Sequence, residues 1–184
     1  MGYQLSFNQI WRNFDKLIDG VILSVELAII AILIGAVIGL VLAVIYVSSG
    51  RVVRAIISAY VEFIRCTPLL LLIFFLYFGL PEFDITFLDK TESFVLSLSL
   101  YAGAYMSEVF RAGLSSIPKQ YVEAAKAIGL RPWQRQAYVV LPVMFRITLP
   151  AVSNNLISLF KDTSLVAIVG LIDDRYELGI KAKM

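Results

Sequence analysis

Four long apolar runs follow one another along the chain. They cover residues 21–47, 55–80, 93–113 and 147–172. Each run is near or above the roughly 20 residues that a helix needs to cross about 30 Å of hydrocarbon. The runs are continuous, whereas an outer-membrane barrel is built from segments of about 10 residues with alternating polarity. The pattern therefore predicts an all-α polytopic membrane protein with four transmembrane helices.

The charges between the runs predict how these helices are oriented. Arg51 and Arg54 lie between the first two runs, and one lysine and four acids lie between the second and the third. Segment 114–146 between the third and fourth runs is rich in Lys and Arg. Because cytoplasmic loops carry an excess of Lys and Arg, the first and third loops are predicted to be cytoplasmic and the amino terminus external. The tail, residues 173–184, is then external too, although it carries three basic residues.

The first twenty residues carry a periodic apolar pattern of their own. Apolar residues recur at spacings of three and four from Phe7 to Ile18. Segment 1–20 is therefore predicted to form an amphipathic helix on the outer membrane surface. A simple extension of the first transmembrane helix is the alternative.

Composition narrows the function classes. Of 184 residues, 59% are hydrophobic and 16% charged, and the mean hydropathy is +0.82. These values exclude a disordered chain, a nucleic-acid module and most soluble enzymes. The net charge of +2 gives no reason to expect a polyanionic partner. The chain has no histidine and a single cysteine, Cys66, so it can form neither an internal disulfide nor a cysteine metal cluster.

Charged residues inside the second run are expensive in lipid and suggest a site. Glu62 and Arg65 are three residues apart and share a helical face. Thr67 and Pro68 follow, and the proline is expected to kink the helix. Interrupted helices of this kind often mark substrate paths in transporters. A structural ion pair that closes the kink is the alternative, and the two interpretations are compatible.

The third and fourth runs also carry polar residues. Asn154, Ser158 and either Lys161 or Asp162 fall on one helical face, which favours a pore lining over a subunit contact. Glu108 lies three residues before Arg111, and either a pairing with Arg111 or a ligand contact explains it.

Segment 114–146 predicts two short helices separated by a glycine turn. Pro118 suits a helix start, and Gly129 is placed to end the helix in the left-handed conformation. Pro132 then begins a second short helix, and Leu141–Pro142 is expected to turn the chain toward the fourth run. The first short helix offers a smooth surface that another protein could dock against, although a plain helical connector is the simpler interpretation of composition alone.

Several motifs together resemble one family. Glu123, Ala124, Ala125, Gly129, Val139, Leu141 and Pro142 reproduce the Glu-Ala-Ala loop of the membrane subunits of bacterial binding-protein-dependent ABC importers, with Val139 in place of the usual isoleucine. The segments beginning at Tyr60, Ala104 and Leu149 resemble the polar amino acid branch of that family. Cys66 and Lys119 stand where glycine is common. The resemblance covers about residues 20–180, nearly the whole chain.

The resemblance implies a type I ABC importer permease fold in the bacterial cytoplasmic (inner) membrane. That fold has a core of five helices, so the chain is either truncated or ends outside the membrane after its fourth helix. It implies pairing with an identical or similar permease subunit, delivery of a polar amino acid by an external solute-binding protein, and a cytoplasmic ATPase dimer. The residues expected to couple to the ATPase are Gln120, Glu123, Ala124, Ala125, Gly129, Leu141 and Pro142.

The chemistry of ATP is expected to belong to the partner. The chain has no phosphate-binding Gly-Lys loop, so ATP and Mg²⁺ would be bound by the ATPase, and this subunit would be neither an enzyme nor a cofactor-binding protein. An intramembrane protease is disfavoured because no histidine is present and Asp162 is the one good membrane aspartate.

An amino acid carries both charges, so its path is expected to use cations and acids. The candidate path residues are Glu62, Arg65, Thr67, Glu108, Asn154, Ser158, Lys161 and Asp162. Another small solute such as an opine is the first alternative as cargo. An ATP-independent channel or secondary transporter is the second alternative, and the Glu-Ala-Ala loop argues against it.

Overall fold

A computed structural model describes the backbone of residues 14–83 and 89–181, and the side chains of residues 18, 21–83, 89 and 91–162. Over this range the chain forms helices and turns and no strand. The elements are α2 (Phe14–Ser48), α3 (Arg51–Cys66), α4 (Leu69–Phe74), the π-helical turn η1 (Phe75–Gly79), the 3-10 turn η2 (Pro81–Phe83), α5 (Lys90–Ser115), α6 (Lys119–Ala127), α7 (Pro132–Arg135), the π-helical turn η3 (Gln136–Val140) and α8 (Leu141–Lys181).

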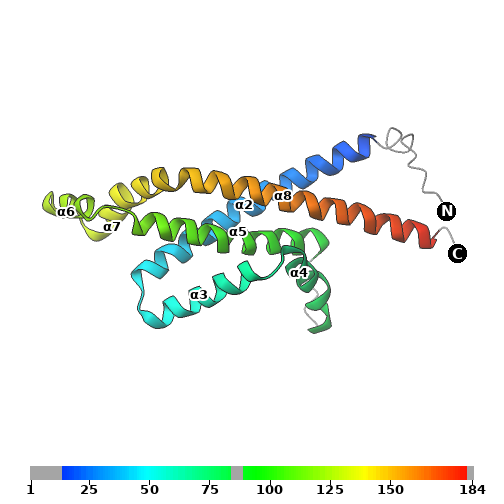
Figure 1. The fold of residues 1–184 in the computed structure, drawn as a ribbon, viewed down its shortest axis with the longest axis horizontal. Coiled ribbons are helices and arrows are strands. Elements are labelled where there is room, and N and C mark those ends of the chain that lie inside the picture. Colours follow the sequence, from blue (N-terminus) through cyan, green and yellow to red (C-terminus); the bar gives the residue numbers. More distant parts are fainter. Residues whose placement is uncertain (1–13, 84–88, 182–184) are drawn as a thin grey trace.

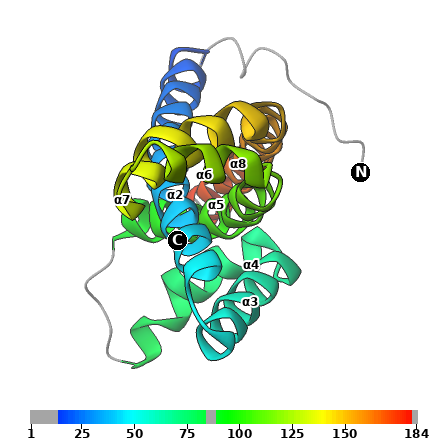
Figure 2. The same cartoon turned by 90° about the vertical axis from the view of Figure 1, so that its left-hand side faces the viewer.

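Helix α5 is the central element of the bundle. It packs against α2, α3, α4 and α8 (Figures 1 and 2). Helices α2 and α5 run in one direction along the bundle and α3 and α8 in the other (Figure 1). The short helices α6 and α7 lie together at one end, which faces the viewer in Figure 2. This arrangement agrees with the predicted all-α fold.

Glycines allow α2 and α5 to approach closely. A Cβ atom at Gly35 would lie 2.5 Å from the Ala102 Cβ, and one at Gly39 would lie 2.7 Å from the Met106 Cβ and 2.8 Å from the Ser107 amide nitrogen. A Cβ at Gly103 would lie 2.9 Å from Ile38. Small residues spaced four apart are a common means of close helix packing in membranes, where lipid tails provide no hydrophobic drive for helix association.

Two clusters of buried side chains fill the bundle. The larger one joins α2, α4, α5 and α8 and includes Leu98, Met106 and Met144. The smaller one packs one face of α3 against α4 and α5, and consists of Ile57, Val61, Ile64, Leu72 and Ala104. The opposite face of α3 is exposed and carries Glu62.

The second predicted transmembrane helix, 55–80, is broken rather than kinked. Helices α3 and α4 meet at 104° across Thr67 and Pro68. Pro68 has no N–H to donate to Ile64, and the residue before a proline is driven out of the helical region. Thr67 is accordingly extended, with φ −93° and ψ 127°. The sequence indicated the position of the break but not its size.

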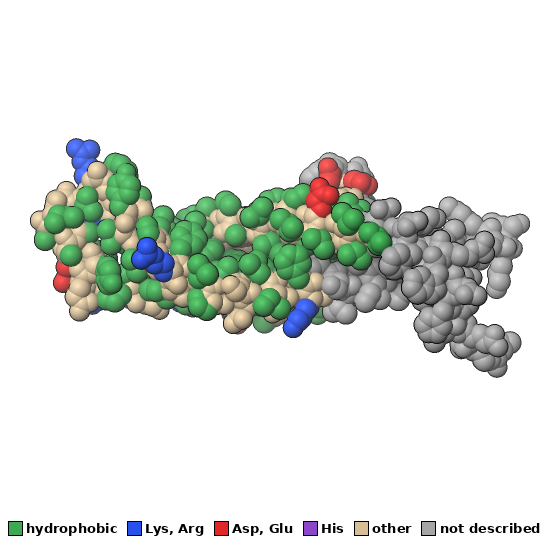
Figure 3. All heavy atoms as spheres, turned by 90° about the horizontal axis from the view of Figure 1, so that it is seen from above, with side chains coloured by type: hydrophobic (Ala, Val, Ile, Leu, Met, Phe, Trp, Pro, Cys, Tyr) green, Lys and Arg blue, Asp and Glu red, His purple; other side chains and the backbone are tan. Residues whose placement is uncertain are grey.

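By length and composition, two helices within the described residues can cross a membrane, Val21–Ser48 and Pro132–Asp162, or three if the bent pair α3–α4 forms one span. Many apolar side chains along these helices are exposed, and Figure 3 shows one face on which hydrophobic side chains extend along the molecule. The third predicted span, 93–113, lies inside α5, which is not apolar enough to be counted with these helices.

Buried serines explain the modest hydropathy of α5. Ser93, Ser97, Ser99 and Ser107 are buried among the surrounding helices. The hydroxyls of Ser97 and Ser99 each donate to a carbonyl one turn earlier, at 2.6 Å, so they need no water. With 26 residues, α5 is about 39 Å long and is sufficient to cross the hydrocarbon.

The two ends of the predicted topology fall partly outside the described residues. Residues 14–20 belong to the same helix as the first apolar run, as in the extension alternative. Residues 1–13, most of the predicted amphipathic segment 1–20, lie outside the described residues, as do 84–88 and the last three residues of the tail 173–184. The fourth predicted span, 147–172, lies within α8, which begins six residues earlier at Leu141.

Replacing Gly39 tests the close packing of α2 on α5. We expect Gly39→Ala to lower the stability of the protein by about 1–3 kcal/mol, because its Cβ would lie against backbone atoms of α5 that cannot move aside. Gly50→Ala is the matched control, since a Cβ there meets nothing within 4 Å. Thermal melting in detergent, followed by size-exclusion chromatography, measures the difference, and equal melting temperatures for the two variants would contradict the packing.

Candidate functional site

The candidate residues lie in two separate regions of the fold. The candidate path residues are on α3, α5 and α8 and, for Thr67, in the break after α3. The candidate coupling residues are on α6 and in the segment from Gly129 to Pro142 at one end of the bundle (Figure 1). The two regions are described in turn.

Arg65 turns toward α5 rather than toward Glu62. Both side chains are exposed, and within the described residues they form no ion pair with each other. The Arg65 guanidinium instead lies over the ring of Tyr105, 5.2 Å from its centroid. The ion pair considered for Glu62 and Arg65 is therefore not formed in this structure, and Arg65 connects α3 with α5.

Thr67 satisfies the carbonyls at the break. Its amide donates to the Ile64 carbonyl at 3.2 Å, which replaces the bond that Pro68 cannot make. Its hydroxyl donates to the Phe63 carbonyl at 2.8 Å. Thr67, a candidate path residue, therefore uses its hydroxyl to stabilise the end of α3.

Two tyrosines of α5 lie close to Arg65, and Asp162 contributes a second charge to their surroundings. The hydroxyl of Tyr101 lies 3.2 Å from that of Tyr105, one helical turn away on α5. Tyr101 interacts electrostatically with Arg65 of α3 and with Asp162 of α8. We call Arg65, Tyr101, Tyr105 and Asp162 the tyrosine cluster. Sequence reasoning missed both tyrosines, although their spacing of four places them on one face of α5.

Glu108 binds Arg111 through both carboxylate oxygens. The Arg111 Nε donates to Oε1 at 3.2 Å and Nη2 donates to Oε2 at 2.7 Å. Such bidentate, charge-assisted pairs are among the stronger hydrogen bonds in proteins. Of the two interpretations of Glu108, the structure contains the Arg111 pairing. Glu108 lies three residues after Tyr105, so the ion pair and the two tyrosines share one face of α5.

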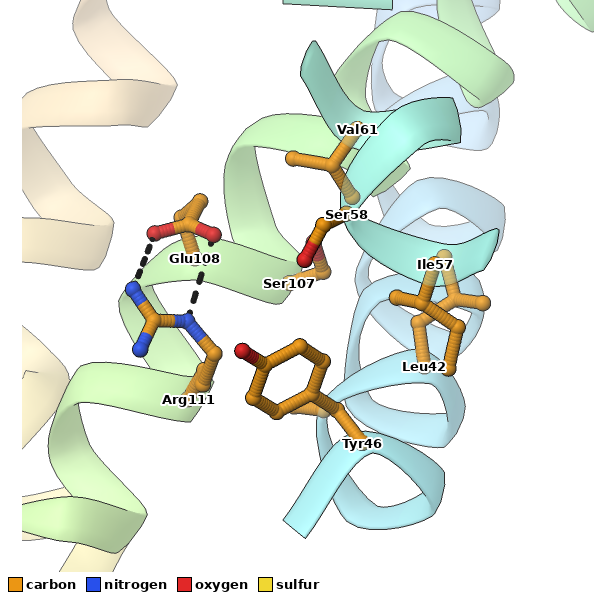
Figure 4. A pocket seen from close by; sticks show the side chains of 9 residues that line it. Leu42, Tyr46, Ile57, Ser58, Val61, Ser107, Glu108 and Arg111 are labelled. Atoms are coloured by element: carbon orange, nitrogen blue, oxygen red, sulfur yellow. Dashed lines mark hydrogen bonds and ion pairs between the residues drawn. The ribbon is translucent and has the colours of Figure 1, made fainter. Parts of the chain in front are cut away.

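A small pocket between α2, α3 and α5 lies beside the ion pair (Figure 4). Tyr46, Ser58, Ser107, Glu108 and Arg111 supply its polar lining, and the remainder is apolar. Figure 4 shows the Glu108–Arg111 pair on one side and the Tyr46 ring beside it. No group of three or more metal-ligating side chains occurs in the described part of the chain.

The polar stripe of α8 is mostly outward-facing in this single chain. Asn154, Ser158 and Lys161 are exposed, and the Ser158 hydroxyl donates to the Asn154 carbonyl at 3.2 Å. Asp162 is half-buried and belongs to the tyrosine cluster. The structure therefore separates Asp162 from the other three members of the stripe.

Helix α6 ends at Gly129 in a left-handed turn, as its sequence predicts. Gly129 has φ +78°. The Gly129 amide donates to the Lys126 carbonyl at 3.0 Å and the Leu130 amide to the Ala125 carbonyl at 3.1 Å, which is the Schellman arrangement. On α6, Gln120, Glu123 and Ala124 are exposed, whereas Ala125 is buried. The helix thus presents the Glu-Ala face outward and anchors itself through Ala125.

The segment after Gly129 continues into α8 without the predicted turn. Residues Pro132–Asp162 form one helix, with the π-helical turn η3 directly before Leu141 and Pro142. Proline removes a helical hydrogen bond, and a wider π-helical turn accommodates such a position without breaking the helix. The expectation that Leu141–Pro142 turns the chain was therefore wrong. Leu141 is half-buried and Pro142 is exposed.

Comparison with known proteins gives consistent matches. Residues 31–179 match the family model described as "Binding-protein-dependent transport system inner membrane component". The "L-cystine transport system permease protein TcyB" of Bacillus subtilis (strain 168) is 34% identical over 185 residues, which cover 98% of this chain and 79% of that protein. The "Probable glutamine ABC transporter permease protein GlnM" of the same organism is 32% identical over 171 residues, which cover 93% of this chain and 79% of that protein.

A solved structure shows a similar fold. It is titled "Crystal structure of an amino acid ABC transporter with histidines" and superposes with a TM-score of 0.77 at 29% sequence identity, over 91% of this chain and 78% of that one.

Substitutions at Gly129 test the turn that positions α6. Nothing lies within 4 Å of a Cβ built there, so the cost of a side chain is purely conformational. We expect Gly129→Val to cost about 1–2 kcal/mol in the left-handed region and to raise hydrogen exchange of the α6 amides. Gly129→Asn is the matched control, because asparagine adopts this conformation readily. Unchanged exchange in the valine variant would show that the turn does not hold α6.

Proposed function

Because this chain belongs to the family of binding-protein-dependent transport system inner membrane components, we propose that it is a membrane-spanning subunit of an ABC importer for polar amino acids. The names of its relatives support an amino acid as cargo, since they are permease proteins for cystine and for glutamine. In this proposal the subunit resides in the bacterial cytoplasmic membrane and receives its solute from an external binding protein.

The exposed face of α6 is the observation that carries the proposal. An importer that uses ATP needs a surface through which the ATPase acts on the membrane helices. Helix α6 lies at the end of the bundle, with Gln120, Glu123 and Ala124 exposed and the Gly129 turn directly behind it. Tyr121 and Ile128 add exposed apolar surface to the same segment. A cytoplasmic ATPase dimer that binds ATP and Mg²⁺ is the partner that fits this surface.

The outward-facing stripe of α8 supports a second permease subunit. Asn154, Ser158 and Lys161 are costly in contact with lipid, so we propose that they face a water-filled path completed by another permease copy. The exposed Glu62 of α3 is suited to the same path.

The tyrosine cluster supplies complementary chemistry for an amino acid. The Arg65 guanidinium is a donor for the carboxylate, and Asp162 together with the tyrosine rings attracts an ammonium group. Glu108 differs from these residues because Arg111 already occupies both of its oxygens. In this proposal Glu108 orients Arg111, whereas Arg65 and Asp162 contact the solute.

A charge reversal at Glu123 tests the coupling surface. We expect Glu123→Arg to abolish co-purification of the cognate ATPase with the permease, because the reversed charge lies on the docking face of α6. Glu82→Arg makes the same change at an exposed site in η2 and serves as the matched control. Membrane insertion and melting temperature should be unaffected in both variants. Retention of the ATPase by Glu123→Arg would refute this docking surface.

Neutralising Arg65 tests the path. We expect Arg65→Gln to reduce uptake of radiolabelled L-glutamine or L-cystine by proteoliposomes about tenfold or more, through a higher KM, because a charged hydrogen-bond donor is lost. Arg51→Gln removes an exposed arginine from the other end of α3 and is the control. If an assembled Arg65→Gln complex takes up solute at the wild-type rate, Arg65 is not part of the path.

A further inference from the structure

The ring of Tyr46 contacts arginines from two other helices. Tyr46 is half-buried near the carboxyl end of α2. The Arg54 guanidinium carbon lies over this ring at 5.8 Å from its centroid, and that of Arg111 lies at 5.4 Å. Both distances are within the roughly 6 Å at which an aromatic face attracts a cation. Tyr46 is therefore the point where α2, the first turn of α3 and the last part of α5 meet.

Arg54 fastens α3 to the end of α2. Its Nε donates to the Tyr46 carbonyl at 2.9 Å and its Nη2 to the Val47 carbonyl at 3.2 Å. Carbonyl groups in the last turn of a helix have no partner within that helix, and the negative end of the helix dipole favours a cation there. The position of Arg54 over the Tyr46 ring is thus set by two hydrogen bonds.

Arg111 connects the same ring to the end of α5 that precedes α6. Glu108 holds the Arg111 guanidinium through two hydrogen bonds, at 2.7 and 3.2 Å. Four residues after Arg111, α5 ends at Ser115, and the Ser116 amide and hydroxyl both donate to the Ala112 carbonyl, at 3.0 and 2.7 Å. Helix α6 begins shortly afterwards at Lys119. Three residues, Ser116 to Pro118, therefore join α6 to the part of α5 that carries Arg111.

We infer that Tyr46 is a positioning residue that transmits movement of α6 to α3 through the linked contacts of Arg111, Tyr46 and Arg54. This role rests on the proposed function, because an ATPase acting on α6 is the source of the movement. Helix α3 is suited to receive it, since its far end is separated from α4 by the 104° break at Pro68. Because α3 carries Glu62 and Arg65, a shift of α3 moves candidate path residues without any contact between Tyr46 and the solute.

The single cysteine of the chain reports the position of α3. Cys66 is exposed at the last residue of that helix, so a nitroxide attached to it follows the helix. We would reconstitute the permease–ATPase complex in lipid nanodiscs, with its other subunits free of cysteine. The measurement is the accessibility of the nitroxide to a water-soluble relaxation agent, before and after addition of ATP with orthovanadate.

The wild-type complex is expected to show an ATP-dependent change in accessibility. Tyr46→Leu removes the ring and should reduce this change at least about twofold, a size typical of substitutions within a coupling network. Tyr46→Phe keeps the ring and removes only the hydroxyl. It should retain the full change, because the ring and not the hydroxyl contacts the two arginines. Tyr77→Leu makes the same substitution in η1, away from α6, and should respond as the wild type does.

A second variant keeps the test decisive if Tyr46→Leu does not assemble. Arg54→Gln removes the cation on the α3 side of the ring and leaves Tyr46 in place, and it should reduce the ATP-dependent change similarly. A response of wild-type size in Arg54→Gln or in an assembled Tyr46→Leu complex would overturn the inference. Absence of any ATP response in the wild type would instead overturn the proposed coupling of α6 to an ATPase.

Discussion

Helices α2 and α5 lie so close together that a single methyl group between them would collide with backbone. Gly35 and Gly39 on α2 and Gly103 on α5 make this approach possible. The remaining elements are arranged around this pair, because α5 also supplies the surface on which α3, α4 and α8 pack. Tyr101, Tyr105 and the Glu108–Arg111 ion pair all project from α5, so the geometry of both sites depends on how tightly α2 packs against that helix.

At the break before Pro68, the released carbonyl groups find hydrogen-bond donors within the protein, which allows a helix to be interrupted in a membrane. Lipid offers no hydrogen-bond partners, so each carbonyl released by a proline needs a donor from the protein. At Pro68 that donor is Thr67, through its amide and its hydroxyl. At the carboxyl end of α2, Arg54 donates to the Tyr46 and Val47 carbonyls of the last turn, which have no partner within the helix. The interruptions in the bundle are thus stable features of the fold rather than regions of lost structure.

The sequence predicted an all-α fold and the left-handed turn at Gly129, because apolar run length and left-handed glycine are properties of short segments. It indicated Pro68 as an interruption but not the 104° angle, since that angle depends on how α4 packs on α5. The turn expected at Leu141–Pro142 was wrong, because a π-helical turn accommodates Pro142 in a way that composition does not reveal. Tyr101 and Tyr105 were missed because a half-buried tyrosine resembles ordinary core until the Arg65 guanidinium is placed over the Tyr105 ring. The contact of Arg65 with Tyr105 depends on which side of α3 packs against α5. That packing is set by the tertiary fold and cannot be derived from the sequence of α3 alone.

The continuity of the helix from Pro132 to Asp162 has a mechanical consequence. These 31 residues alone span about 46 Å, and helix α8 continues beyond them to Lys181. A helical rod of this length acts as a lever arm, and its first residues lie beside α6. A tilt of a few degrees at Pro132 then displaces residues near Asp162 by several ångströms, so a small rotation beside α6 becomes a large lateral movement farther along the helix. Asn154 and Ser158, well along the rod, would travel much farther than Trp133 at its beginning.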